Sequence, residues 1–254
     1  MKAFILAAGI GKRLQPLTLK LPKPLVPVNG IPLLCYTLLR LKQAGISELI
    51  INTCYLGDKI ADFLQHHANF GFDIYISAEK ELSGTGGGIK NCQNLLKEPF
   101  LLINADIICD IDLTDLIEHW QNKPQSLLAL SKNGKPSVAT AQQRVLDFSN
   151  LRKSGIADNL AYTGNALLQP EIFQSMPEGY SSLVSFGFIP LVNIAKLGYW
   201  EHKGWWFDLG TCERLRQAER FLETKKDINK ILAGLNIAPD QGYLDWMYRS
   251  FMEV

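Results

Sequence analysis

The chain has 254 residues, of which 47% are hydrophobic and 20% charged, and its 26 basic residues nearly balance 25 acidic ones. This composition is typical of a globular chain of one or two domains, and it argues against a disordered chain or a general nucleic-acid-binding surface. No apolar stretch reaches the ~18 residues of a membrane span. The five cysteines are scattered and odd in number, which argues against a disulfide framework or a zinc site. We expect a cytoplasmic protein that binds neither a membrane nor nucleic acid.

Apolar runs and helical patterns alternate along the first hundred residues. Strands are predicted over residues 3–8, 48–52, 72–76 and 100–104, and helices over residues 31–44, 57–67 and 86–96. Such alternation is typical of an α/β fold with a doubly wound, mostly parallel sheet and helices on both faces.

The second half of the chain is richer in predicted strands. Strands are predicted over residues 126–130, 144–148, 162–168 and 205–208, and helices over residues 183–196, 211–223, 227–235 and 242–251. We expect a main domain of residues 1–223 containing a strand-rich insertion, followed by a helical C-terminal extension of residues 224–254. The extension packs either on the domain or on a partner subunit of a homo-oligomer, and both alternatives stay open.

Positive charge is concentrated in the loop after the first predicted strand. Seven basic residues and no acidic residue precede Glu48, so the rest of the chain carries 19 basic against 25 acidic residues. Gly9 and Gly11 lie in this loop, where glycine lets the backbone approach a ligand and successive N–H groups form a concavity for anions. Four cations follow them, namely Lys12, Arg13, Lys20 and Lys23. The loop is therefore predicted to bind several phosphate groups.

Two common phosphate-binding motifs do not fit this loop. A Walker loop needs Gly-x-x-x-x-Gly-Lys-Ser/Thr, and the loop lacks that spacing. A dinucleotide fingerprint needs a third glycine where Leu14 stands, and an acid roughly 20 residues further on to hold a ribose. No acid occurs between Gly11 and Ser47, so a nicotinamide enzyme is not indicated.

A third motif does fit. Leu6-Ala-Ala-Gly-Ile-Gly-Lys-Arg-Leu-Gln-Pro-Leu-Thr18, followed by Pro22-Lys-Pro-Leu-Val-Pro-Val28, resembles the signature of sugar-1-phosphate nucleotidyltransferases. The resemblance implies a Rossmann-like fold and the transfer of a nucleotidyl group from a nucleoside triphosphate to a sugar 1-phosphate. It also implies that Arg13 and Lys23 are catalytic, and that the nucleotide is bound by Leu6, Ala8, Gly9, Gly11 and Lys12. The residues agree with this, because Pro22 and Pro24 hold the backbone around Lys23 extended and Arg13 can grip pyrophosphate with two hydrogen bonds.

A second glycine-rich segment, Ser77 to Ile89, lies between a predicted strand and a predicted helix. Its glycines are expected to let a flat base lie close to the backbone. In the family that the chain resembles, this segment holds the nucleobase, which implies base contacts from Gly84, Thr85 and Gly86 and a base-reading role for Glu79. Because a carboxylate only accepts hydrogen bonds, Glu79 suits uracil N3–H or the guanine N1–H and N2 edge. We therefore expect UTP, then GTP.

Two aspartates are predicted to follow strands. Asp106 comes after residues 100–104, and Asp208 lies in Trp205-Trp-Phe-Asp-Leu-Gly-Thr211. The resemblance implies that this pair holds Mg²⁺, which binds one or two carboxylates together with phosphate oxygens. Alternatively, Asp208 only caps the following helix. One departure from the family pattern is Ala105, which stands where the family usually has glycine.

Sugar contacts are implied for Asn104, Gly164 and Asn165, because Tyr162-Thr-Gly-Asn165 resembles the strand that contacts the sugar in the family. The lysine motif that many relatives place before that strand has no clear counterpart. The resemblance favours UTP with N-acetylmuramate 1-phosphate, a reaction of cell-wall sugar recycling, and GTP with mannose 1-phosphate is the alternative. A regulatory relative that binds a nucleotide-sugar without making it also stays open.

Overall fold

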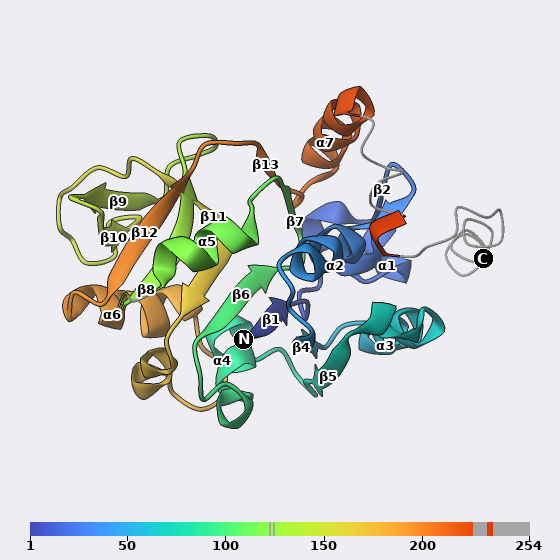
Figure 1. Cartoon of the computed structure of the whole chain (residues 1–254), viewed down its shortest axis with the longest axis horizontal. Helices are drawn as coiled ribbons and strands as arrows, with labels where there is room; N and C mark the ends of the chain where they lie inside the picture. Colours follow the sequence, from blue (N-terminus) through green and yellow to red (C-terminus); the bar gives the residue numbers. More distant parts are fainter. Residues whose placement is uncertain (122, 124, 226–232, 236–254) are drawn as a thin grey trace.

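A nine-stranded sheet runs through the computed structural model, which describes residues 1–121, 123, 125–225 and 233–235 (Figure 1). In spatial order its strands are β5 (Asp73–Ala78), β4 (Glu48–Thr53), β1 (Lys2–Leu6), β6 (Phe100–Asn104), β11 (Ala161–Leu168), β8 (Ser126–Ser131), β12 (Leu197–His202), β10 (Arg144–Phe148) and β9 (Val138–Ala141). The pairings make β10 and β11 run opposite to the other strands of this sheet. The sheet is therefore mostly parallel, as predicted.

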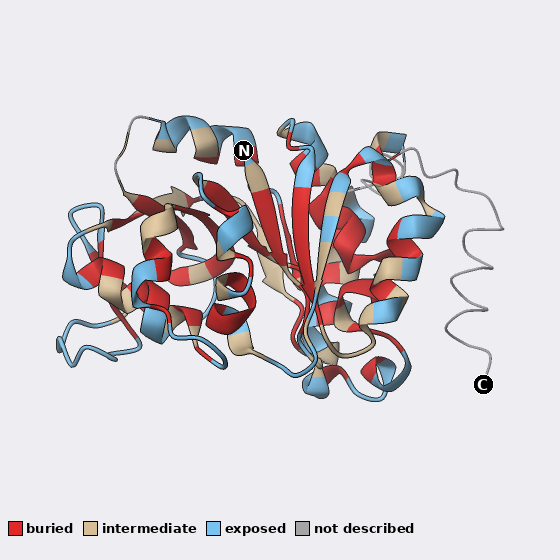
Figure 2. Cartoon of the chain, turned by 90° about the horizontal axis from the view of Figure 1, so that it is seen from below, coloured by how far each residue is buried: buried red, intermediate tan, exposed pale blue. Residues whose placement is uncertain are grey.

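Helices cover both faces of the parallel half of the sheet. Alternate residues of β1 therefore point into two different cores. Ile5 belongs to the core formed with α2 (Leu33–Gln43), α3 (Gly57–His66), α5 (Leu113–Trp120) and α7 (Cys212–Lys225). Phe4 belongs to the second core, formed with α4 (Gly84–Lys90) and α6 (Ile189–Asn193). Ile5 and Phe4 are both fully buried, as expected for a parallel strand covered on both sides. Figure 2 shows these buried strands between helices whose outer faces are exposed.

The carboxyl ends of β1, β4, β5 and β6 meet at one edge of the sheet. Leu6 is the register partner of both Asn52 and Asn104, and Asn52 is in turn the partner of Ser77. The loops after these four strands therefore lie side by side, although they are far apart in the sequence. Ligands of open α/β sheets bind at this edge.

A separate two-stranded ladder joins β7 (Ile107–Cys109) to β13 (Trp206–Asp208). Asp208 is the register partner of Ile107, and the N–H of Leu209 donates to the carbonyl of Asp106 at 3.0 Å. The ladder thus places the two aspartate-bearing segments next to each other, 102 positions apart in the sequence. A short hairpin of β2 (Pro27–Val28) and β3 (Ile31–Pro32) and the single-turn helix α1 (Leu17–Lys20) complete the elements near the first loop.

Several elements differ from the sequence-based expectation. The helix predicted over residues 183–196 is a π-helical turn, Val184–Phe188, followed by α6, and the chain then enters β12, which was not predicted. The helix predicted over residues 86–96 begins two residues earlier, at Gly84, and ends at Lys90 before a 3₁₀ turn over Gln93–Leu95. The short strands β7 and β9 and the helix α5 were also not predicted.

The C-terminal extension is described only in part. The predicted helix over residues 242–251 and most of the one over 227–235 lie outside the described residues. Leu235 is 2% exposed and belongs to the same core as α2. Within the described part of the chain, no helix is both long and apolar enough to cross a membrane.

Candidate active site

The first loop contains two glycines in different environments. Among the described residues, no atom other than those of Gly9 and its two chain neighbours lies within 4 Å of the position that a Cβ on Gly9 would take. Gly11 has φ +68°, and a Cβ there would lie 2.9 Å from Cγ2 of Thr18 and 3.2 Å from Cβ of Lys23. The hydroxyl of Thr18 donates to the carbonyl of Gly11 at 2.8 Å. Gly9 can therefore face a ligand, whereas Gly11 lets the loop fold back onto the segment that carries Lys23.

Two ion pairs, each between a basic side chain and an aspartate, involve Lys23 and the segments that carry the two aspartates. The ammonium of Lys23 donates to Oδ2 of Asp106, and both side chains are largely buried. Nη1 of Arg214 lies 3.2 Å from Oδ2 of Asp208. A Cβ on Gly210 would lie 2.7 Å from Nη2 of Arg13 and 3.1 Å from Oδ1 of Asp208, so the guanidinium of Arg13 is also near Asp208. The structure thus pairs Lys23 with Asp106 and places Arg13 and Arg214 beside Asp208, and the β7–β13 ladder holds the two aspartate segments next to each other.

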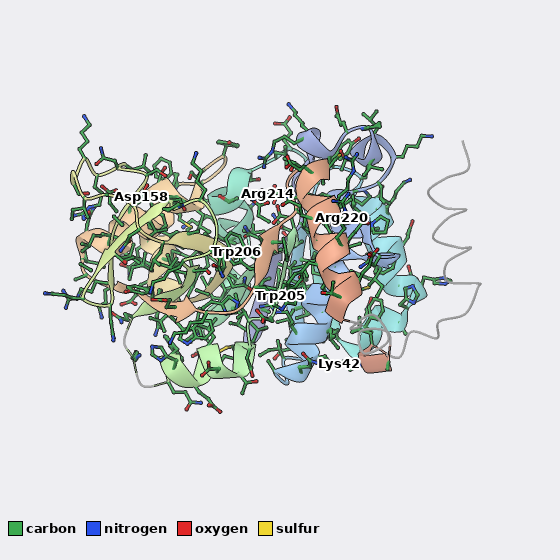
Figure 3. All side chains as sticks on the ribbon, turned by 90° about the horizontal axis from the view of Figure 1, so that it is seen from above. Lys42, Asp158, Trp205, Trp206, Arg214 and Arg220 are labelled. Carbon is green, nitrogen blue, oxygen red and sulfur yellow. The ribbon has the colours of Figure 1, made fainter. Side chains whose placement is uncertain are left out.

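The first turn of α7 supplies Arg214, just after the strand that carries Trp206 (Figure 3). The helix is capped by Thr211, whose hydroxyl oxygen accepts from the N–H of Arg214 at 3.4 Å. Asp208 is therefore not the cap of this helix, and its carboxylate can face the cation cluster. The alternative interpretation of Asp208 as only a helix cap does not hold.

Asp106 and Asp208 are the residues here that could hold a divalent cation that also binds phosphate. Within the described residues there is no group of three or more His, Cys, Asp or Glu side chains that could hold a metal alone. Mg²⁺ does not need one, since it commonly takes one or two carboxylates and completes its shell with phosphate oxygens and water. Lys23 and Arg214 already place positive charge beside Asp106 and Asp208. Each of the two carboxylates therefore already has a cationic partner in this structure.

A cavity extends from Asp106 toward the loop after β5. It brings together many residues that the sequence predicted for the site: Leu6, Ala8, Gly9, Lys23, Glu79, Gly84, Thr85, Asn104 and Asp106. Ala105 also lines it and is 2% exposed, with its N–H donating to the carbonyl of Leu6 at 3.1 Å. Lys12 is exposed in a 3₁₀ turn, Lys12–Leu14, and is not among the lining residues.

Glu79 lines the same cavity as Asp106 and accepts hydrogen bonds on both of its carboxylate oxygens. Its Oε1 accepts from Nδ2 of Asn52 at 2.6 Å, and its Oε2 accepts from the N–H of Ser83 at 2.9 Å. Asn52 also lines the cavity, although its side chain was not predicted as a site residue. Asn52 lies directly at the carboxyl end of a predicted strand, and the same kind of position led to the prediction of Asp106. Arg214 gave no comparable signal, because it lies inside a helical pattern.

The glycine run of α4 packs closely against another segment of the chain. A Cβ on Gly86 would lie 2.6 Å from Oγ of Ser181, and a Cβ on Gly87 would overlap the carbonyl oxygen of Gly179. The N–H of Gly86 donates to the carbonyl of Ser181 at 2.9 Å. These glycines therefore allow the distant segment 179–183 to pack against the helix. Gly84 and Thr85 line the cavity, but Gly86 does not.

The residues predicted to contact the sugar are separated by the structure. A Cβ on Gly164 would lie 3.0 Å from Nδ2 of Asn104, so Gly164 lies directly against a residue that lines the cavity. Asn165 is fully buried, and its amide bonds Nη2 of Arg40 at 2.8 Å and the carbonyl of Thr163 at 3.0 Å. The pairing of β11 with β8 shifts register between Tyr162 and Asn165. In this structure Asn165 does not reach the cavity, contrary to the expectation, because its side chain is already committed inside the core.

Comparison with known proteins gives a consistent result. A family model described as nucleotidyl transferase matches residues 2–225. An N-acetylmuramate alpha-1-phosphate uridylyltransferase of Neisseria meningitidis serogroup B is 35% identical over 225 residues, covering 86% of this chain and 97% of that enzyme. A mannose-1-phosphate guanyltransferase of Pichia angusta is 30% identical over 221 residues, covering 83% of this chain but 61% of that enzyme. Among solved structures, a Bacillus anthracis protein provisionally assigned as a glucose-1-phosphate thymidylyltransferase matches with a TM-score of 0.77 at 25% identity, covering 87% of this chain and 94% of that one.

Proposed function

Because the chain belongs to the nucleotidyl transferase family, we propose that it transfers the uridylyl group of UTP to a sugar 1-phosphate, releasing pyrophosphate. N-acetylmuramate 1-phosphate is the favoured acceptor, which the similarity to the Neisseria meningitidis enzyme supports. The observation that carries the proposal is the cavity itself. Lys23, Asp106 and the acceptor Glu79 all line it, so a single bound nucleotide can contact all three.

The proposed reaction is a direct displacement. An oxygen of the sugar 1-phosphate attacks the α-phosphorus of the triphosphate, and the bond to the pyrophosphate oxygen breaks. The attacking phosphate is already ionised near neutral pH, so the protein supplies positioning and positive charge and needs no general base. Arg13 and the backbone near Gly9 stabilise the leaving pyrophosphate, and Lys23 contacts the α-phosphate and the incoming sugar phosphate. Asp106 and Asp208 would hold Mg²⁺, which when bound neutralises charge on the phosphate oxygens.

Cysteine chemistry is not part of this proposal. Burial raises the pKa of the Cys54 thiol, and the carboxylates of Glu79 and Glu81 raise it further. Burial likewise raises the pKa of Cys92. Because the thiolate is the reactive form, thiols kept protonated near the base-binding end of the cavity are poor nucleophiles.

The choice of base follows from Glu79. Asn52 and Ser83 both donate to its carboxylate, which keeps it an acceptor toward a ligand. Uracil offers its N3–H to such an acceptor, whereas cytosine and adenine present a ring nitrogen that is itself an acceptor. Guanine also has a donor edge, so GTP with mannose 1-phosphate is the second candidate. The similarity to the Pichia angusta guanyltransferase supports this candidate.

A matrix of four nucleoside triphosphates against a panel of sugar 1-phosphates tests the proposal, with pyrophosphate release measured in Mg²⁺ and in chelator. We expect release with UTP and N-acetylmuramate 1-phosphate, and none with the metal chelated. Preferred use of GTP and mannose 1-phosphate would favour the second candidate. Preferred use of CTP or ATP would refute the role given to Glu79. Binding of a nucleotide-sugar without any turnover would identify a regulatory relative.

Location and assembly belong to the same proposal. A cytoplasmic role in cell-wall sugar recycling follows from the proposed acceptor and from the use of a nucleoside triphosphate, without a membrane or a nucleic acid as partner. Homo-oligomerisation through residues 224–254 stays a prediction, which sedimentation of the full chain would test. A monomer at all concentrations would contradict it.

A further inference from the structure

Asn52 occupies the last part of β4, between the loops that carry the two halves of the cavity. It is 1% exposed, yet it is one of the residues that line the cavity. Its register partners are Leu6 on one side and Ser77 on the other. It therefore lies between the first loop, which begins at Ala7, and the base loop, which begins at Glu79.

The orientation of the Asn52 amide is fixed by its partners. Oδ1 of Asn52 accepts from the N–H of Ala7 at 2.9 Å, and a backbone N–H can only donate. The amide oxygen must therefore face Ala7, and the amide nitrogen must face Oε1 of Glu79, 2.6 Å away. The same amide group thus connects the first loop to the base loop.

Glu79 receives protein donors on both carboxylate oxygens. Nδ2 of Asn52 donates to Oε1, and the N–H of Ser83 donates to Oε2 at 2.9 Å. These two donors fix the direction of the lone pairs that remain for a ligand.

Gly88 shows how closely this connection is packed. A Cβ on Gly88 would lie 2.5 Å from Nδ2 of Asn52 and 2.9 Å from Oε1 of Glu79. Gly88 is buried and is not among the residues that line the cavity. Its lack of a side chain is required by the Asn52–Glu79 hydrogen bond.

We propose that Asn52 is a positioning residue of the nucleotide site, which holds Glu79 as a hydrogen-bond acceptor in register with the first loop. Asn52 acts through Glu79, so it influences base selection and nucleotide binding and not the displacement itself. This inference rests on the proposed function in one respect, namely that Glu79 contacts the base.

A double-mutant cycle tests the proposal. The variants are Asn52→Leu, Glu79→Ala and the double variant, and Asn91→Leu is the matched control. Asn91 is exposed and its amide bonds Oγ of Ser83 from outside the cavity at 3.3 Å. For each variant, KM for UTP, KM for the sugar 1-phosphate, kcat and the calorimetric Kd of UTP with Mg²⁺ are measured.

We expect Asn52→Leu to raise KM and Kd for UTP by about 10- to 100-fold, the range for loss of a hydrogen bond to a charged group. In Asn52→Leu, KM for the sugar phosphate and kcat should change less than about threefold, because the Asn52–Glu79 hydrogen bond does not contact the sugar phosphate or the reacting atoms. Asn91→Leu should resemble the wild type, because Asn91 takes no part in that hydrogen bond. In the Glu79→Ala background Asn52→Leu should have little further effect, since residues that act as a unit are not additive. The preference for UTP over CTP should fall in both single variants.

The inference would be overturned if the effects of Asn52→Leu and Glu79→Ala on the Kd of UTP were additive. It would also be overturned if Asn52→Leu raised KM for UTP and KM for the sugar phosphate equally. If Asn52→Leu does not fold, Asn52→Asp serves instead, because it keeps the acceptor for Ala7 and removes the donor to Glu79. The same selective loss of UTP binding is expected, and its absence counts against the inference. The proposed function fails separately if the wild-type protein binds UTP but releases no pyrophosphate with any of the sugar 1-phosphates. Absence of binding by all four nucleoside triphosphates would overturn both.

Discussion

Gly9 and Gly11 are two residues apart, and the structure predicts opposite consequences for replacing them. A methyl group on Gly9 would meet no atom within 4 Å in the described part of the chain beyond its two chain neighbours, whereas on Gly11 it would lie 2.9 Å from Thr18 and would require a left-handed backbone. We expect Gly9→Ala to leave the melting temperature unchanged and to raise KM for the nucleotide roughly tenfold, about 1.4 kcal/mol, because the methyl group occupies space used by the phosphates. Gly11→Ala should instead lower the free energy of unfolding by about 1–3 kcal/mol. Thermal denaturation and KM separate the two, and an unchanged KM for Gly9→Ala would contradict close approach of the ligand.

Charge at the reacting end of the cavity gives a second prediction. Arg13→Ala and Asp106→Asn each remove one electrostatic contact of the proposed transition state, and such losses commonly cost about 10²–10³ in rate. We expect decreases of that size in kcat with the fold retained, because both side chains are at least partly exposed.

Arg216→Ala is the matched control for Arg13→Ala, since Arg216 is an exposed arginine of α7 outside the carboxylate pair. Pyrophosphate release and far-ultraviolet circular dichroism are the two measurements. Release near the wild-type rate from either variant would remove that residue from the mechanism.

At the residue scale, Asp106 was expected at the end of an apolar strand, whereas the role of Glu79 came from the resemblance to the family. The parallel registers bring the two strand ends to one edge of the sheet, and both residues line the cavity. Asn165 lies on the same face of β11 as Leu167, which belongs to the core that also contains α2, so its side chain bonds Arg40 and does not line the cavity. Both faces of β11 are buried, so the hydrophobic pattern does not show which face each residue takes.

At the scale of elements, α4 depends on a segment almost a hundred residues away. The N–H of Leu183 donates to the hydroxyl oxygen of Thr85 at 3.0 Å, and the N–H of Ser181 donates to the carbonyl of Ser83 at 2.9 Å. The glycine content of α4 predicted a site for close approach, but sequence alone could not show that the approaching group is another part of the chain. This also explains why a seven-residue helix with four glycines is stable here, although glycine disfavours helices.

Gly87→Ala tests this packing. The added methyl group would overlap the carbonyl oxygen of Gly179, and a backbone atom cannot move away as a flexible side chain could. We expect the free energy of unfolding to fall by about 1–3 kcal/mol, as for other overpacked sites. KM for the nucleotide should rise as well, since Gly84 and Thr85 of the same helix line the cavity. Urea denaturation and steady-state kinetics give both quantities, and an unchanged stability would show that the two segments separate easily.

At the scale of the whole molecule, the predicted order of strands and helices was confirmed best in the parallel half. There, β1, β4 and β6 are largely apolar runs that alternate with helices along the chain, so local pattern and tertiary arrangement agree. The β7–β13 ladder could not be predicted, because two three-residue strands carry little pattern and pair across almost a hundred residues. That ladder nevertheless brings Asp208 to Asp106, so the proposed metal pair depends on the least predictable contact of the fold.

The boundary of the main domain, expected at residue 223, can be tested through Leu235. This side chain is 2% exposed in the core that also contains α2, and a Cβ on its neighbour Gly234 would overlap Leu39. We expect Leu235→Ala to lower the free energy of unfolding by about 2–5 kcal/mol, as for other buried leucines, with kcat and both KM values unchanged because the cavity lies elsewhere. Ile194→Ala is the control, since Ile194 is 61% exposed and should change stability by no more than about 0.5 kcal/mol. Equal stabilities of the two variants in urea denaturation would mean that the core ends with α7 and that the boundary at residue 223 is correct.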